Sequence, residues 1–163
     1  MPIVLGLPEV VGSAHISRCG QYRYSLKRCW DPSLPQALII GLNPSTADAT
    51  LDDPTVRRCV GFVRDWGFGG LALVNLFAFR AIDPSSLVGP PDPVGPENDD
   101  WIARLADESD LVVAAWGVHG GLKARDSAVI RMLGPLHCLG RTKDGFPRHP
   151  LYLSRHTQLE AFR

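Results

Sequence analysis

Two asparagines and one histidine are the residues of this sequence that are best placed for chemistry. Asn43 comes shortly after the apolar run Ala37–Ile40, Asn75 interrupts the run Leu71–Phe77, and His149 stands in a loop rich in glycine and proline. An unpaired buried amide costs about 1–3 kcal/mol, so an asparagine in a buried strand needs partners. Asn75 therefore either bonds the neighbouring backbone and fixes the following loop, or reads the edge of a ligand ring.

The loop from Gly41 to Asp52 joins the first apolar run to the start of a helix. It contains small polar residues such as Ser45, the conformationally restricted Pro44, and few bulky side chains. One interpretation is an ordinary strand-to-helix turn with Asn-Pro punctuation. The other is a binding loop, because ligands of open α/β sheets bind at the carboxyl ends of the strands.

Three aspartates at the end of this loop, Asp48, Asp52 and Asp53, could together hold a magnesium ion. The pattern favours a simpler role. Asp53 precedes Pro54 as a helix N-cap does, and the other two aspartates suit a solvated surface. We therefore expect no metal and no cofactor in this protein.

Other arrangements of reactive residues are weaker. Ser45 and His149 could belong to a Ser-His-Asp triad, but the sequence lacks the G-x-S-x-G motif. The turn Gly117–Gly121 opens a helix and could offer N–H groups to a phosphate, although no P-loop or G-x-G-x-x-G fingerprint is present. Basic residues of the neighbouring loops could form a local positive patch: Arg80, Arg141, Lys143 and Arg148.

Continuous apolar runs alternate with helical patterns along the chain. Strands are expected at 37–41, 71–76, 111–116 and 136–139, and helices at about 54–66, 98–108 and 122–133. Apolar runs without polar alternation are typical of parallel strands that are buried on both faces. The expected fold is one α/β domain over residues 1–163, a three-layer α/β/α sandwich with a four-stranded, mainly parallel sheet.

The remaining segments are expected at the periphery. Residues 1–20 are predicted to be irregular, and residues 22–30 to form a strand at the edge of the sheet. The loops 77–97 and 140–150 are predicted to form mobile walls of the site, because long loops inside a compact domain are usually functional or disordered.

Composition limits the classes of function. The chain has 163 residues, with 17 Lys+Arg and 17 Asp+Glu, so its net charge is zero. Strong non-specific binding of nucleic acid is therefore not expected. It has no apolar run long enough to span a membrane, and its first residues lack the basic flank of a signal peptide. Four widely spaced cysteines predict neither a metal site nor disulfides. We expect a cytoplasmic protein that does not bind membranes.

Four motifs, taken in order, resemble the motif series of the uracil-DNA glycosylase superfamily: Gly41-Leu42-Asn43-Pro44, Val74–Arg80, Val112–Gly117 and His149-Pro150-Leu151. The first resembles the water-activating G-x-[D/N]-P loop, and the second the strand that ends in a base-reading asparagine. The third is similar to a core strand ending in glycine, and the fourth to a motif beginning His-Pro. Over nearly the whole chain, the sequence also resembles a bacterial and phage family known only as a domain of unknown function, through GLNPSTAD, DDPTVRR, NLFAFRA, AWG and TKDGFPRHPLYL.

The resemblance to the glycosylases implies a nucleobase-recognising hydrolase of N-glycosidic bonds, in DNA repair or nucleotide metabolism. Asn43 would orient a water, Asn75 would read the base edge, and His149 would donate a hydrogen bond to the base oxygen. The same resemblance implies a substrate site completed by Gly41, Pro44, Ser45, Phe77, Arg80 and Gly117.

The sequence also departs from the glycosylase pattern. Leu151-Tyr152-Leu153 follows the His-Pro motif in place of Ser-Pro, and no aromatic residue stands where one would stack on the base, unless Phe77, Phe79 or Phe62 substitutes. Two alternatives therefore stay open: a hydrolase of free or modified nucleosides and nucleotides, and a non-catalytic nucleotide-binding sensor. The zero net charge favours both over an enzyme that tracks DNA, and single strands are the expected substrate if DNA is bound.

Overall fold

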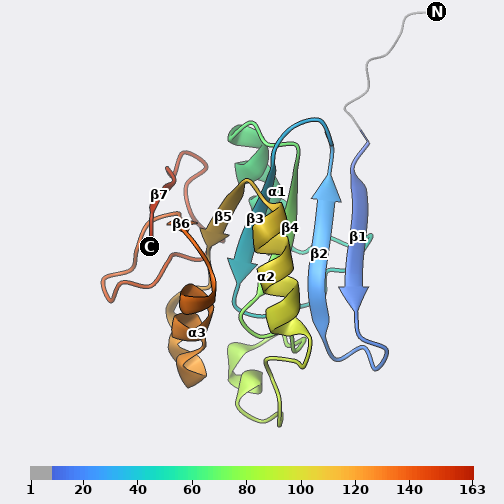
Figure 1. The fold of residues 1–163 in the computed structure, drawn as a ribbon, viewed down its shortest axis with the longest axis vertical. Coiled ribbons are helices and arrows are strands. Elements are labelled where there is room, and N and C mark those ends of the chain that lie inside the picture. Colours follow the sequence, from blue (N-terminus) through green and yellow to red (C-terminus); the bar gives the residue numbers. More distant parts are fainter. Residues whose placement is uncertain (1–8) are drawn as a thin grey trace, which may run out of the picture.

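The computed structural model describes residues 9–163, and the expectations for residues 1–8 lie outside this range (Figure 1). The strands are β1 (Val11–Ile16), β2 (Arg23–Cys29), β3 (Gln36–Gly41), β4 (Gly70–Asn75), β5 (Leu111–Ala114), β6 (His137–Cys138) and β7 (Glu160–Ala161). The helices are α1 (Pro54–Asp65), α2 (Asn98–Glu108) and α3 (Arg125–Met132), with short 3-10 segments η1 (Pro84–Leu87) and η2 (Val118–Ala124).

The strands form one sheet in the order β1-β2-β4-β3-β5-β6-β7. The neighbours β4–β3, β3–β5 and β5–β6 are parallel, whereas β1–β2, β2–β4 and β6–β7 are antiparallel. The α/β class is therefore confirmed. The expected sheet of four strands is wrong in extent, because seven strands pair within residues 9–163 and antiparallel strands flank the parallel ones on both sides.

Three local expectations also need correction. The segment expected to be irregular contains β1, whose mostly exposed residues give little apolar pattern to detect. The strand expected at the edge, β2, lies inside the sheet between β1 and β4. The helix expected at 122–133 begins only at Arg125, because Lys123 and Ala124 adopt left-handed backbone angles, each with φ of 54°.

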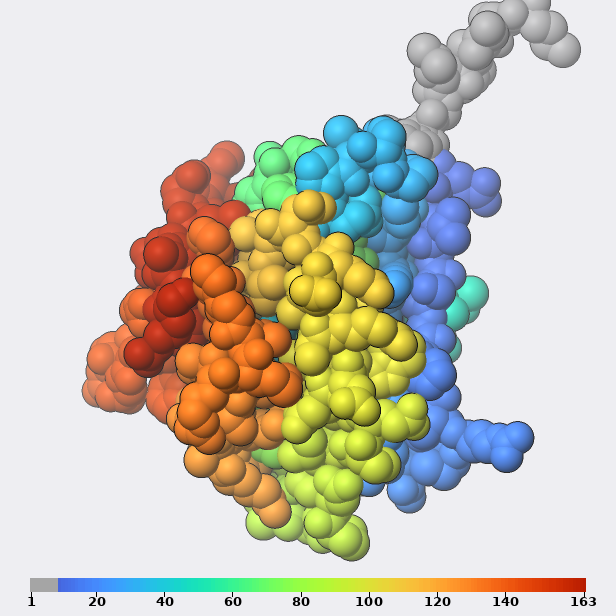
Figure 2. All heavy atoms as spheres, in the orientation of Figure 1, coloured from blue at the N-terminus to red at the C-terminus, as the bar shows by residue number. Residues whose placement is uncertain are grey.

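Helices cover both faces of the sheet. Alternate residues of β3 separate the two cores: Leu38 and Ile40 belong to the cluster that packs against α2 and α3, and Ala37 and Ile39 to the cluster against α1. Figure 1 shows α2 and α3 in front of the sheet, and Figure 2 shows them side by side on the surface of that face. A strand with helices on both sides must be apolar at successive positions, which explains its unbroken apolar run.

The order of the parallel strands defines where a ligand would bind. The chain passes from β3 through α1 to β4 on one side, and β5 then pairs with the other side of β3. In doubly wound sheets the crevice at such a reversal, outside the carboxyl ends of the strands, is the usual binding position. Helix α1 starts beside this crevice. Asp53 is its N-cap, because its carboxylate accepts a hydrogen bond from the Val56 backbone N–H at 2.8 Å.

Candidate functional site

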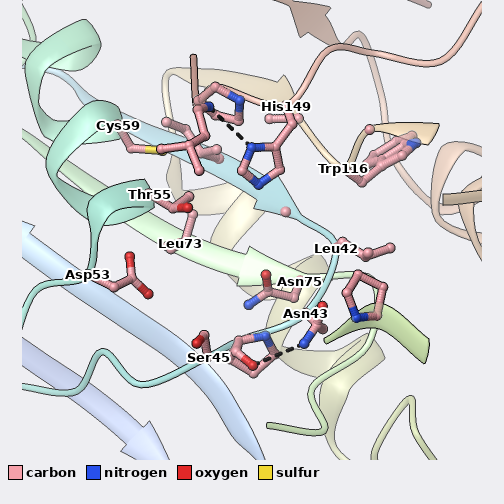
Figure 3. A pocket seen from close by; sticks show the side chains of 18 of the residues that line it. Leu42, Asn43, Ser45, Asp53, Thr55, Cys59, Leu73, Asn75, Trp116 and His149 are labelled. Atoms are coloured by element: carbon pink, nitrogen blue, oxygen red, sulfur yellow. Dashed lines mark hydrogen bonds between the residues drawn. The ribbon is translucent and has the colours of Figure 1, made fainter. Parts of the chain in front are cut away.

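A cavity of about 430 Å³ opens at the carboxyl ends of β3, β4 and β5 (Figure 3). Its walls come from the loop after β3, the first turns of α1, residues 81–84, the turn after β5 and residues 149–151. Its volume lies in the usual range of small-molecule sites, about 300–1,000 Å³. The cavity therefore occupies the position that the topology favours, and its size suits a small ligand.

Asn75, the last residue of β4, is the central polar side chain of this cavity. It is 3% exposed, and its Nδ2 is buried without a hydrogen-bond partner among residues 9–163. The backbone around it is fixed, because the buried Asn98 amide donates to the carbonyls of Asn75 and Leu76 at 2.9 and 3.1 Å. The backbone that carries the side chain is therefore held in place, while the amide donor is not satisfied, which is the condition expected of a group that awaits a ligand.

Gly41 makes room for this amide. A β-carbon built on Gly41 would lie only 2.7 Å from Oδ1 of Asn75, closer than real β-carbons come to any such atom. The two residues face each other in the parallel register of β3 and β4. Gly41 of the first motif thus leaves the space that the side chain of Asn75, in the second motif, occupies.

Asn43 lies below Asn75 in Figure 3 and is held more firmly. Its Nδ2 donates to the carbonyls of Ala81 and Pro44 at 2.7 and 3.1 Å. Both amide hydrogens are thereby used, so only Oδ1 is left to accept a hydrogen bond from a ligand or a water. A neutral amide of this kind can orient a water but cannot act as a strong base.

His149 faces Asn75 from the opposite side of the cavity (Figure 3). Its Nδ1 accepts a hydrogen bond from the Leu151 backbone N–H at 3.1 Å, so the neutral ring carries its proton on Nε2. Burial lowers the pKa of His149 below its usual value, and the charge of Asp53 opposes this shift. The ring is therefore neutral at pH 7 and offers one N–H donor.

The loop that carries His149 is tied to the turn after β5. The Gly117 backbone N–H donates to the Pro147 carbonyl at 2.9 Å, and Gly117 has a φ of 74°, which glycine adopts without strain. A β-carbon on Gly117 would also meet the His149 side chain at 3.5 Å. Gly117 therefore acts on the site through its conformation, which allows the loop that carries His149 to lie against the turn after β5.

The structure brings together most of the residues that the sequence predicts for the site. Those that line the cavity are Gly41, Asn43, Pro44, Ser45, Asn75, Gly117 and His149. Phe77 does not line the cavity: it is fully buried in the core against α2 and α3, because the strand direction carries it away from the crevice. Arg80 is also outside the lining, and its Nε donates to the Ser45 carbonyl at 3.4 Å.

Sequence reasoning missed other lining residues, of which Arg23, Thr55 and Trp116 are examples. Trp116 is 1% exposed, and its Nε1 has no partner among residues 9–163. It is the aromatic side chain of the cavity wall, whereas Phe62 and Phe79 lie outside the lining. Its position at the end of an apolar run, directly before Gly117, was the available signal.

The weaker arrangements considered from the sequence are not assembled. The carboxylate of Asp48 accepts from the backbone of Thr50 and Leu51, Asp52 pairs with Arg28 at 2.9 Å, and Asp53 caps α1. No cluster of His, Cys, Asp or Glu that could hold a metal occurs among residues 9–163. All four cysteines are free thiols.

The basic patch and the Ser-His-Asp triad considered from the sequence are not assembled either. Arg141 donates to the Phe162 carbonyl at 2.6 Å, and Arg148 donates to the Arg141 carbonyl at 3.2 Å, so both support the C-terminal loops. Within the described chain no hydrogen bond joins Ser45 to His149, whose Nδ1 is already used by Leu151.

Comparison with known proteins identifies a family. Residues 23–151 match the model of a family described as a protein of unknown function, DUF1643, and the chain belongs to this family. No curated protein and no solved structure matches the chain. The resemblance to the uracil-DNA glycosylases therefore stays a prediction from the motifs. Between residues 9 and 163 there is no helix of the length and apolarity needed to cross a membrane.

Proposed function

We propose that this cavity recognises a nucleobase and that the protein hydrolyses an N-glycosidic bond. The observation that carries the proposal is Asn75, a buried amide with an unused donor on the wall of a cavity of ligand size. An amide presents a donor and an acceptor side by side, which matches the edge of a base. The neutral Nε2–H of His149 adds a second donor on the opposite wall.

The apolar walls suit a flat ring. Ile39, Leu42, Leu73 and Trp116 line the cavity between the polar groups. Ligand sites of this kind combine apolar surface for affinity with a few placed polar groups for orientation. A base that is bound between these walls would present its edge to Asn75.

The proposed chemistry assigns a distinct task to each polar group. His149 donates to the base oxygen on which negative charge develops, and one such donor is typically worth about 10²–10³ in rate. Asn43 orients the attacking water through Oδ1, since its amide hydrogens are engaged. The bond between sugar and base breaks with its electron pair going to the base, the water oxygen bonds to the sugar carbon, and the proton that the water loses neutralises the departing base. Asp53 is the acidic residue of the lining, and its negative charge favours the oxocarbenium-like transition state of glycosidic cleavage.

A non-catalytic nucleotide sensor is the second candidate. The observation in its favour is Asn43, whose two backbone hydrogen bonds would equally serve to hold the loop in shape. On this alternative Asn75 and His149 bind the base in the same way, but no bond is broken.

A base-release assay distinguishes the hydrolase from the non-catalytic sensor. The panel contains uracil- and hypoxanthine-bearing single-stranded oligonucleotides, together with uridine, inosine and their 5′-monophosphates. The proposal expects release of free base from at least one of them, and a fall of about 10²-fold or more in His149→Ala. Asn43→Ala should reduce the rate as well, with binding of the substrate retained.

The control variant is His156→Ala, which removes an exposed histidine that does not line the cavity. It should leave base release close to the wild-type rate. Absence of release from every substrate, with base binding that is lost in Asn75→Ala, would replace the hydrolase by the sensor. Absence of both release and binding would refute base recognition.

A further inference from the structure

Arg23, the first residue of β2, is a buried cation on the wall of the cavity. It is 2% exposed, and burial lowers its pKa to about 10, so it remains charged at neutral pH. Removing a cation from water costs several kcal/mol unless polar or anionic partners compensate. The hydrogen-bond partners that Arg23 has, and those that it lacks, therefore indicate which chemical group the cavity binds.

The protein itself satisfies Arg23 only in part. Its Nη1 donates to the Ala47 carbonyl at 3.1 Å, and its Nε is buried without a partner in residues 9–163. The charge of Asp53 raises the pKa of Arg23, but the ion pairs of the described chain do not include these two residues. One oxygen of Asp53 is used on the Val56 N–H. The guanidinium thus keeps donors, in a fork that fits a phosphate or carboxylate, for a ligand.

The loop after β3 adds backbone donors beside this cation. Its carbonyls accept hydrogen bonds from the surrounding protein: Leu42 from Phe77, Pro44 from Ala81, Ser45 from Arg80, Ala47 from Arg23 and Asp48 from Arg28. In contrast, the N–H groups of Ser45, Thr46 and Ala47 donate to no residue of the described chain. Ser45 and Thr46 line the cavity. Neighbouring N–H groups without an acceptor in the protein are available to an anionic ligand.

We propose that the cavity binds a phosphate group of its ligand between Arg23 and the Ser45–Thr46 backbone, so that the ligand is a nucleoside phosphate. The proposal rests on the proposed function for the base, which Asn75 and His149 would hold. In Figure 3 Ser45 and His149 lie on opposite sides of Asn75, so base and phosphate would occupy different ends of one cavity. The phosphate belongs either to a free mononucleotide or to a nucleic-acid strand, and the test separates these sources.

The test measures binding to the folded wild-type chain by isothermal titration calorimetry. The probes are uridine and inosine, their 5′-monophosphates, a single-stranded tetranucleotide of each, and inorganic phosphate alone. A monophosphate should bind about 10- to 100-fold more tightly than its nucleoside, as a charge-assisted contact provides. Tighter binding of the tetranucleotide would assign the phosphate to a strand, and tighter binding of the monophosphate to a free nucleotide.

Variants connect this preference to Arg23. Arg23→Gln should bring the monophosphate down to the affinity of the nucleoside, and Arg23→Lys should restore part of the difference. The matched control is Arg80→Gln, which removes another arginine that holds the same loop but does not line the cavity. Retention of the preference in Arg80→Gln supports the proposal, and an equal loss in both variants overturns it.

Failure of this inference differs from failure of the proposed function. Equal binding of nucleoside and monophosphate, with both lost in Asn75→Ala, overturns the phosphate site but supports base recognition. Binding of phosphate that depends on Arg23, with no difference between nucleotides and phosphate alone, supports the anion site and refutes base recognition.

A measurement on the wild type covers the case in which Arg23→Gln does not fold. Phosphorus NMR of the bound monophosphate reports the second pKa of its phosphate, which is about 6 in the free nucleotide. A guanidinium in contact favours the dianion and should lower this pKa. An unchanged or raised pKa would overturn the proposal.

Discussion

Gly41→Ala is the substitution that tests the geometry of the site with the smallest chemical change. The added β-carbon would lie 2.7 Å from Oδ1 of Asn75, so the amide must move while the backbone of β3 can stay in place. Nothing charged or polar is added or removed. The expected consequence is a misdirected Asn75 in a chain that still folds.

The size of the effect follows from this contact. Moving Asn75 off its preferred rotamer costs about 0.5–1.5 kcal/mol of folding free energy. For a domain of this length, about 1 kcal/mol lowers Tm by about 2–4 °C. Loss of the one or two hydrogen bonds that Asn75 would make to a base, at about 0.5–1.5 kcal/mol each, should weaken ligand binding by about tenfold or more.

Calorimetric titration with the tightest-binding nucleotide checks the expected loss of affinity, and thermal unfolding checks the expected fall in Tm. The matched control is Gly61→Ala on the exposed side of α1, where a β-carbon meets no atom within 4 Å. It should raise the unfolding free energy by about 1 kcal/mol and leave binding unchanged. Wild-type binding in Gly41→Ala would refute the reasoning that Asn75 reads the ligand.

Asp53→Ala should lower the unfolding free energy by about 0.5–2 kcal/mol through loss of the α1 cap, whereas Asp53→Ser should stay near the wild-type value in a denaturant titration; equal losses would contradict the capping role. His149 has a lowered pKa, so its ring should gain a second proton only below pH 6.5, on the Nδ1 that accepts from the Leu151 N–H. Because that proton breaks the bond that orients the ring, ligand binding should hold through pH 6.5 and weaken below it. The unfolded chain then binds the extra proton first, so the unfolding free energy also falls as pH drops below 6.5; an unchanged profile in His149→Gln would assign the effect elsewhere. Burial raises the pKa of Cys59 to about 12, so iodoacetamide should modify exposed Cys19 and spare Cys59 until the chain unfolds, as mass spectrometry would show.

The sequence was sufficient to predict the gathering of Asn43 and Asn75 because a simple rule governs parallel strands. Their carboxyl ends lie at one edge of the sheet, so a polar residue at the end of each apolar run meets the others there. His149 follows the same logic, since its loop succeeds β6. The caps and boundaries of α1 were predictable for a local reason: the Asp-Pro pair at Asp53 marks a helix start.

Arg23 could not be found in this way, because its position depends on pairing between distant segments. β2 runs antiparallel to β4, so the amino end of β2, and not its carboxyl end, lies beside Asn75. Nothing in the local pattern of residues 22–30 tells an interior strand from an edge strand. The short strands β6 and β7, of two residues each, are likewise defined by their partners rather than by their own composition.

A crystal structure of the protein with uridine 5′-monophosphate or inosine 5′-monophosphate tests the central claim most directly. The account predicts a base whose edge lies within about 3.2 Å of the Asn75 amide. His149 Nε2 should face a base oxygen. A nucleotide that binds outside the cavity, or inside it with the base turned away from Asn75, would contradict the account.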